Sequence, residues 1–131
     1  MKSRLFVYGT LRPDIAPAYL SDVVKHFCLL GEAQLSGRLY GLRTFPGLIL
    51  DPAGAGIVHG RIYEVAHACL DELDSHLARL DAYEGFDPNN AASSLFCRVR
   101  CEPKVCGATM ESWVYVYNRP VDESMRIIDW R

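Results

Sequence analysis

The chain has 131 residues, half of them hydrophobic, and 14 Lys plus Arg against 16 Asp plus Glu leave a formal net charge of -2. This length and composition predict a single globular domain over residues 1–131 with a substantial core. The balanced charge excludes a nucleic-acid surface. The first apolar run is broken by Gly9 and Arg12 and is too short for a signal peptide or a membrane span, so we expect a cytoplasmic protein without a membrane partner.

The cysteines and histidines show no metal-binding motif. The odd number of cysteines and the lack of a C-x-x-C pair predict free, buried thiols; these residues are Cys28, Cys69, Cys97, Cys101 and Cys106. Cys97 and Cys101 would share one face of a strand, which makes a common zinc ion conceivable. The histidines offer no cluster in sequence to complete such a site; they are His26, His59, His67 and His76. We therefore expect no metal.

The first motif is an apolar run that breaks at a glycine. Phe6-Val7-Tyr8 predicts a buried strand, and Gly9 would permit a backbone conformation closed to other residues. Residues 10–14 would then open a helix with backbone N–H groups facing outward. Such a turn can cradle an anion, although a plain strand-to-helix turn has the same pattern.

The middle of the chain alternates short strands with glycines. A short helix is predicted over residues 15–24, and residues 41–47 are expected to form a turn or loop. Gly37 is expected to mark a bulge or a bend, and the phase difference between Ile57 and Ile62 suggests another bulge near Gly60. The predicted strands cover residues 27–33, 35–40, 48–50, 57–65, 95–102 and 110–117.

One long helix has the strongest pattern in the sequence. Its apolar positions follow spacings of three, four and three residues, at Leu70, Leu73, Leu77 and Leu80. Gly85 is suited to ending this helix in a left-handed conformation. One long helix, one short helix and six or seven brief strands predict an α+β fold, which we expect to be a small, strongly bent mixed β-barrel with flanking helices.

Glu84, at the end of this helix, is the best candidate for a general base. Partial burial between Tyr83 and Gly85 and the negative end of the helix dipole would both raise the pKa of its carboxyl. An acid that simply ends a helix in water is the alternative. Asp81 lies three residues earlier, close enough to couple to Glu84, although such a residue more often caps a loop or pairs with an arginine such as Arg98.

Tyr115, in the last long strand, shares one face with Trp113 and Tyr117. Its hydroxyl would point into a cavity, or its ring would serve only for packing.

These motifs together resemble the γ-glutamylcyclotransferase-like superfamily, especially its small AIG2-like and γ-glutamylamine cyclotransferase-related members. The similarity runs almost end to end in order. Its segments are Phe6-Val7-Tyr8-Gly9-Thr10-Leu11-Arg12-Pro13, Gly37-Arg38-Leu39-Tyr40, Phe45-Pro46-Gly47, Val58-His59-Gly60-Arg61-Ile62-Tyr63, Leu80-Asp81-Ala82-Tyr83-Glu84-Gly85-Phe86, Phe96-Cys97-Arg98-Val99, Trp113-Val114-Tyr115-Val116-Tyr117 and Asp129-Trp130.

The resemblance implies a role for each candidate residue. Glu84 matches the catalytic glutamate of the family, and Tyr115 matches its pocket tyrosine. The turn after the first strand would bind the α-carboxylate of a γ-glutamyl group through Tyr8, Gly9, Thr10 and Leu11. Asp14 stands where the family often has glycine, and residues 87–94 have a sequence of their own, which would affect the leaving group accepted.

The implied reaction closes a γ-glutamyl amine or amino acid into 5-oxoproline and releases the free amine, with a small γ-glutamyl compound as the partner and no cofactor. A non-catalytic binding or regulatory module with the same pocket is the alternative. A hydrolase or lyase acting on another amide would share the base. The sequence fixes neither the substrate nor the oligomeric state.

Overall fold

The computed structural model describes residues 3–9, 16–42, 45–51, 53–54 and 56–127. Its helices are α1 (Ser21–Val24) and α2 (Leu70–Glu84), with short 3-10 helices at Ala18–Leu20, Ala91–Ser93 and Glu123–Met125. Its strands are β1 (Arg4–Val7), β2 (Phe27–Leu42), β3 (Phe45–Leu50), β4 (Ile57–Val65), β5 (Phe96–Cys101), β6 (Lys104–Val105), β7 (Ala108–Thr109), β8 (Ser112–Tyr117) and β9 (Arg126–Ile127).

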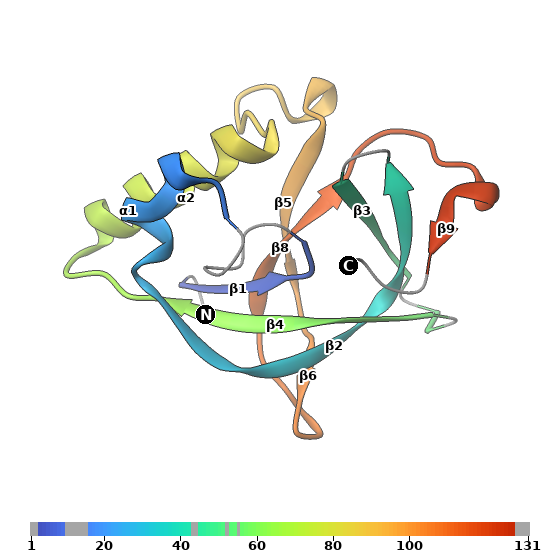
Figure 1. The fold of residues 1–131 in the computed structure, drawn as a ribbon, viewed down its shortest axis with the longest axis horizontal. Coiled ribbons are helices and arrows are strands. Elements are labelled where there is room, and N and C mark those ends of the chain that lie inside the picture. Colours follow the sequence, from blue (N-terminus) through green and yellow to red (C-terminus); the bar gives the residue numbers. More distant parts are fainter. Residues whose placement is uncertain (1–2, 10–15, 43–44, 52, 55, 128–131) are drawn as a thin grey trace.

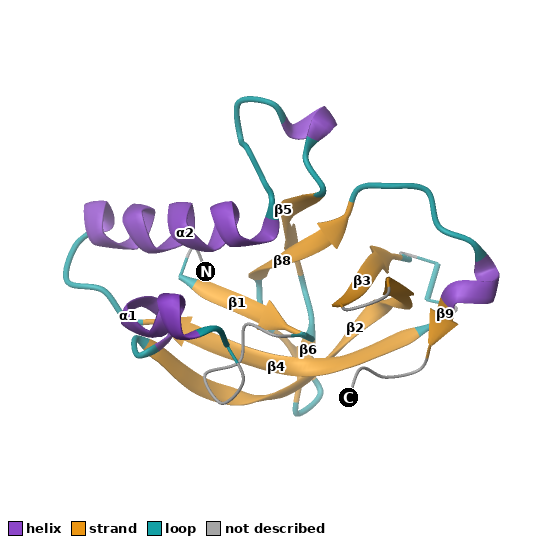
Figure 2. Ribbon diagram, turned by 45° about the horizontal axis from the view of Figure 1, so that its top comes forward, coloured by secondary structure: helices purple, strands orange, loops and turns teal. Residues whose placement is uncertain are grey.

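The strands form one strongly curled mixed sheet, in the order β5-β8-β1-β4-β2-β6-β7, with β3 and β9 also paired to β2 (Figure 1). The β1–β8 pair is parallel and the other pairs are antiparallel. Helices α1 and α2 lie together over one side of this sheet, as Figure 2 shows. The predicted α+β class and strongly bent sheet are therefore confirmed.

Strand β2 makes the curl because it changes partner along its length. Its residues up to Ser36 pair with β4, and those from Gly37 onward pair with β3. The register irregularity lies between Leu29 and Gly31, not at Gly37, which is the point where the partner changes. A long strand that serves two partners in succession bends the sheet upon itself.

Two other predictions in this region are wrong. The segment expected as a loop is mostly strand, because β2 extends to Leu42 and β3 begins at Phe45. No bulge is needed near Gly60, since Ile57 is exposed while Ile62 is buried on the opposite face. An odd spacing along a strand places two residues on opposite faces, which accounts for the pattern.

Two hydrophobic cores lie on the two faces of the sheet. One core joins the helices to the sheet through Leu73, Leu77 and Leu80, and the other fills the inside of the curl around Phe6. Leu5 and Val7 face the first core. Strand β1 is thus buried on both faces, which explains why its sequence is apolar without alternation.

The long helix runs as predicted, with one exception at its start. Leu73, Leu77 and Leu80 are buried, whereas Leu70 is 63% exposed at the first helical position. Gly85 has a φ of 72° and its N–H reaches the carbonyls of Ala82 and Asp81, which ends the helix in the left-handed conformation expected. Arg79 pairs with Asp22 and so joins α2 to α1.

The five cysteines are free, but the expectation that they are buried holds for Cys101 alone; Cys97 is partly exposed and the others are exposed.

No helix among the described residues is long and apolar enough to cross a membrane.

Candidate active site

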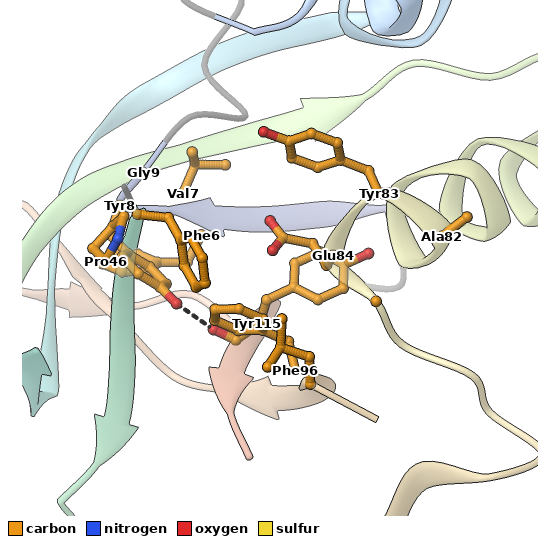
Figure 3. Close-up of a pocket in the computed structure, with 13 residues that line it drawn as sticks. Phe6, Val7, Tyr8, Gly9, Pro46, Ala82, Tyr83, Glu84, Phe96 and Tyr115 are labelled. Carbon is orange, nitrogen blue, oxygen red and sulfur yellow. Dashed lines mark hydrogen bonds between the residues drawn. The ribbon is translucent and has the colours of Figure 1, made fainter. Parts of the chain in front are cut away.

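A cavity of about 280 Å³ opens where the end of α2 meets the ends of several strands. Its walls come from five separate parts of the chain, and most of its lining is apolar or aromatic (Figure 3). The lining residues are Phe6, Val7, Tyr8, Gly9, Phe45, Pro46, Ala82, Tyr83, Glu84, Gly85, Leu95, Phe96 and Tyr115. A small pocket with apolar walls and few polar groups is typical of a ligand site.

Glu84 supplies the ionisable group of this cavity. The last turn of α2 and the left-handed Gly85 fix its backbone, and its carboxyl points into the cavity (Figure 3). Burial raises the pKa of this carboxyl to about 7. The upward shift expected from the sequence is thus confirmed, with desolvation as its cause. A carboxyl with a pKa near neutrality can both accept and return a proton.

Asp81 anchors the end of α2 to the sheet. Its buried carboxylate accepts two hydrogen bonds from Arg98 of β5, from Nε at 2.8 Å and from Nη2 at 3.2 Å. The Tyr115 hydroxyl of β8 donates a third, at 2.7 Å. The Arg98 guanidinium also lies over the Trp113 ring, 4.5 Å from its centroid. The expected pairing of Asp81 with Arg98 is therefore confirmed.

Tyr115 lines the cavity with its ring, but its hydroxyl is bonded to Asp81. Burial, and then the neighbouring Asp81 charge, raises the pKa of this hydroxyl well above its ordinary value. The ring therefore provides a rigid wall, and its predicted contact with substrate remains a prediction.

Tyr8 bridges two strands that share no backbone pairing within the described residues. Its hydroxyl donates to the Tyr115 carbonyl of β8 at 2.7 Å and accepts from the Leu48 N–H of β3 at 3.2 Å. Burial and the Glu84 charge raise the pKa of the hydroxyl, so it remains protonated. Tyr8 thus links β3 to β8 through its side chain, beside the cavity.

The turn after β1 is described only in part. Gly9 lines the cavity, and Thr10 and Leu11 lie outside the described residues, as does the helix expected over residues 10–14. The φ of Gly9 is not in the left-handed region, contrary to expectation. A Cβ there would instead lie 3.2 Å from Cγ of Pro46, so the close approach of this proline favours glycine.

Four of the predicted site residues, Tyr8, Gly9, Glu84 and Tyr115, are therefore brought to one cavity. Sequence reasoning assigned no site role to the aromatic walls, Phe45, Tyr83 and Phe96. All three residues did fall within segments that carried the family resemblance, and this position was the signal that could have identified them.

Comparison with known proteins agrees with this arrangement. Residues 5–131 match the family described as gamma-glutamyl cyclotransferase, AIG2-like. The chain is 33% identical over 129 residues to the gamma-L-glutamyl-butirosin B gamma-glutamyl cyclotransferase of Niallia circulans, covering 97% of this chain and 74% of that protein. It is 30% identical over 131 residues to the gamma-glutamylcyclotransferase family protein YtfP of Escherichia coli K12, covering 97% of this chain and 95% of that protein.

Solved structures show the same fold at lower identity. YkqA from Bacillus subtilis superposes with a TM-score of 0.68 at 20% identity, over 99% of this chain and 40% of that one. A solution structure from Arabidopsis thaliana gives a TM-score of 0.67 at 22% identity, over 97% of this chain and 75% of that one. This chain thus spans about two fifths of YkqA.

The fold and cavity define a small α+β protein with an acid-containing ligand pocket. The chain belongs to the gamma-glutamyl cyclotransferase, AIG2-like family.

The Asp81 cluster generates a prediction about stability. Asp81→Asn should lower the free energy of unfolding by about 3 kcal/mol, because Arg98 would keep its buried charge without a counter-ion. Urea unfolding followed by circular dichroism measures the change. Asp22→Asn, which removes an exposed partner of Arg79, is the matched control and should change stability little. Equal effects of the two substitutions would contradict the anchoring role of Asp81.

The raised pKa of Glu84 predicts a pH-dependent gain in stability on its neutralisation. The carboxyl is protonated up to a pKa of about 7 in the fold, but ionises near 4.5 when unfolded, so its destabilising effect grows between these pH values. Glu84→Gln should match the wild type at pH 4 and be more stable at pH 8, by about 1–3 kcal/mol. Urea unfolding at both pH values tests this; a pH-independent difference would refute it.

Proposed function

We propose that this protein cyclises a γ-glutamyl amine or γ-glutamyl amino acid to 5-oxoproline and releases the free amine. The single observation that carries the proposal is a carboxyl with a pKa near 7, that of Glu84, inside a cavity that also contains the end of β1. Membership of the family and the name of the Niallia circulans relative support the same reaction class.

The reaction is an intramolecular aminolysis. The substrate's α-amine attacks its own γ-carbonyl carbon, which forms a C–N bond and closes a five-membered lactam. The bond from that carbon to the leaving nitrogen then breaks. Because nucleophile and electrophile belong to one short chain, holding the substrate in a folded conformation supplies much of the rate acceleration.

Glu84 would carry the proton between the two nitrogens. Its ionised carboxylate takes a proton from the substrate ammonium and so produces the nucleophilic amine. The protonated carboxyl then gives that proton to the departing nitrogen as its bond to carbon breaks. The attacking nitrogen must lose a second proton as the lactam forms, and the regenerated Glu84 carboxylate passes this proton to the released amine, which leaves as an ammonium ion. Proton and charge then balance without water or a cofactor, and a pKa near 7 suits these transfers.

The turn that begins at Tyr8 and Gly9 would hold the other end of the substrate. Backbone N–H groups after β1 would bind the α-carboxylate, as the family resemblance implies for residues 8–11. Tyr8 would contribute through its backbone, since its hydroxyl is already bonded to β3 and β8. The two substrate ends would thus meet parts of the chain more than 70 residues apart, between Gly9 and Glu84.

The aromatic walls would exclude water from the reacting atoms. Phe45 and Phe96 lie with their ring centroids 5.8 Å apart, and both line the cavity. Such walls raise the pKa of the base and disfavour hydrolysis, because an attacking water molecule has little room. The product would therefore be 5-oxoproline in preference to glutamate.

Replacing Glu84 tests its role as the base. Glu84→Gln should lower kcat by about 100- to 10,000-fold, since the amide cannot accept the ammonium proton. The assay incubates the protein with a panel of γ-glutamyl amines, γ-glutamyl amino acids and glutathione and detects 5-oxoproline by mass spectrometry. For the wild type, kcat/KM should rise with pH through about 7 as Glu84 ionises.

The control is Asp74→Asn, which removes an exposed carboxylate from the same helix and should leave turnover unchanged. Undiminished turnover by Glu84→Gln would disprove the mechanism. Glutamate as the product would instead indicate a hydrolase, and tight binding without any product would indicate a binding module.

The proposed role of the turn is tested by changing the substrate. A γ-glutamyl amide and the corresponding 4-aminobutanoyl amide differ only in the α-carboxylate, and both can close a five-membered lactam. The amide that lacks the carboxylate should show kcat/KM lower by about 10- to 100-fold, because charge-assisted hydrogen bonds are lost. Equal kcat/KM values would remove the anion-binding role from the turn while leaving the role of Glu84 intact.

A further inference from the structure

Two histidines and a glutamate meet beside the first half of α2, away from the cavity. Glu72 and His76 are four residues apart on the helix, which places them on one face, and His76 Nε2 lies 3.4 Å from Glu72 Oε1. His26, between α1 and β2, stacks its ring on that of His76, with centroids 4.6 Å apart and planes inclined by 34°. The fold thus assembles a cluster that the sequence spacing does not show.

The donor atoms of this cluster are close enough to share one ion. One ligand atom from each of the three residues lies within 4.8 Å of the other two. In a tetrahedral zinc site with bonds of about 2.0–2.1 Å, neighbouring ligand atoms are about 3.3 Å apart. The distance of 3.4 Å between His76 Nε2 and Glu72 Oε1 is already close to this separation, and the His26 nitrogen would have to approach them by rotation of its ring.

The type and setting of the donors favour a particular class of metal. Two imidazole nitrogens and one carboxylate oxygen suit Zn²⁺ and neighbouring divalent transition metals, whereas Mg²⁺ and Ca²⁺ prefer oxygen ligands alone. The His76 side chain is 12% exposed and that of Glu72 is 34% exposed, so an ion can enter from solvent. Water would complete its coordination.

Hydrogen bonds to two other segments hold the backbone of His26 in place. Its N–H donates to the Val23 carbonyl at 3.0 Å, and its own carbonyl accepts from the Ala66 N–H at 2.8 Å. The nearby Arg79–Asp22 pair already ties α1 to α2. A ligand set carried by two supported elements needs side-chain rotation and little backbone movement to bind an ion.

We propose that His26, Glu72 and His76 form a binding site for Zn²⁺ or a similar divalent transition metal, which clamps the α1–β2 connection to α2. The site is separate from the cavity, since the eight residues from His76 to Glu84 span about 12 Å of helix. It goes beyond the proposed cyclisation, and either proposal can fail without the other.

The test is a calorimetric titration of the purified full chain with Zn²⁺ alone, after treatment with EDTA. We expect one ion per chain, with affinity reduced at least about tenfold in His26→Asn and in His76→Asn. Zn²⁺ should also raise the Tm of the wild type, and excess EDTA should reverse this rise. The Tm of each variant in EDTA shows whether its apo form is folded.

Matched controls separate this cluster from other donors. His59→Asn removes an exposed histidine elsewhere and should leave Zn²⁺ affinity unchanged. Cys28→Ser and Cys69→Ser remove exposed thiols close in sequence to the cluster and should likewise have no effect. The proposal is overturned if affinity falls with the thiols and not with the histidines, or if His26→Asn and His76→Asn bind Zn²⁺ as the wild type does.

Discussion

The site depends on the hydrogen bonds that the buried carboxylate of Asp81 accepts from two strands. This carboxylate receives Arg98 from β5 and the Tyr115 hydroxyl from β8, so the end of α2 is fixed against two strands at once. A buried charge is tolerated only when it is paired and hydrogen-bonded, and this requirement admits few positions for the helix end. Glu84 lies about one helical turn after Asp81, so fixing the helix end also fixes the backbone of Glu84. This anchor and the left-handed Gly85 together fix the helix end from which the Glu84 carboxyl points into the cavity.

Asp81 and Glu84 show how neighbouring acids in one helix acquire different properties. Asp81 is compensated by a guanidinium and a hydroxyl. Glu84 has no comparable cation among the described residues, and burial alone raises the pKa of its carboxyl to about 7. The first acid therefore serves structure, and the second is available for proton transfer.

Tyr8 has a role both in the scaffold and in the cavity. Its hydroxyl links β3 to β8, where the curled sheet has no backbone pairing in its described part, while its ring lines the cavity. The bond to the Tyr115 carbonyl brings Tyr8 beside the strand that also supports Asp81. The same few contacts of Tyr8 thus hold the curled sheet together and shape the wall of the pocket.

The sequence by itself determined the features that follow from local pattern. Leucine spacing predicted α2 and Gly85 its end, while ordered motifs indicated the family and nominated Glu84, Tyr8 and Tyr115. Local pattern could not show that Leu70 would be exposed, that β2 would serve two partners, or that Pro46 would account for Gly9. The sequence predicted a raised pKa for Glu84 but left open a solvated acid at the helix end, and tertiary structure decided between them. It also decided the meeting of His26 with His76. Desolvation and proximity depend on segments distant in the chain, and a sequence pattern records only neighbours along it.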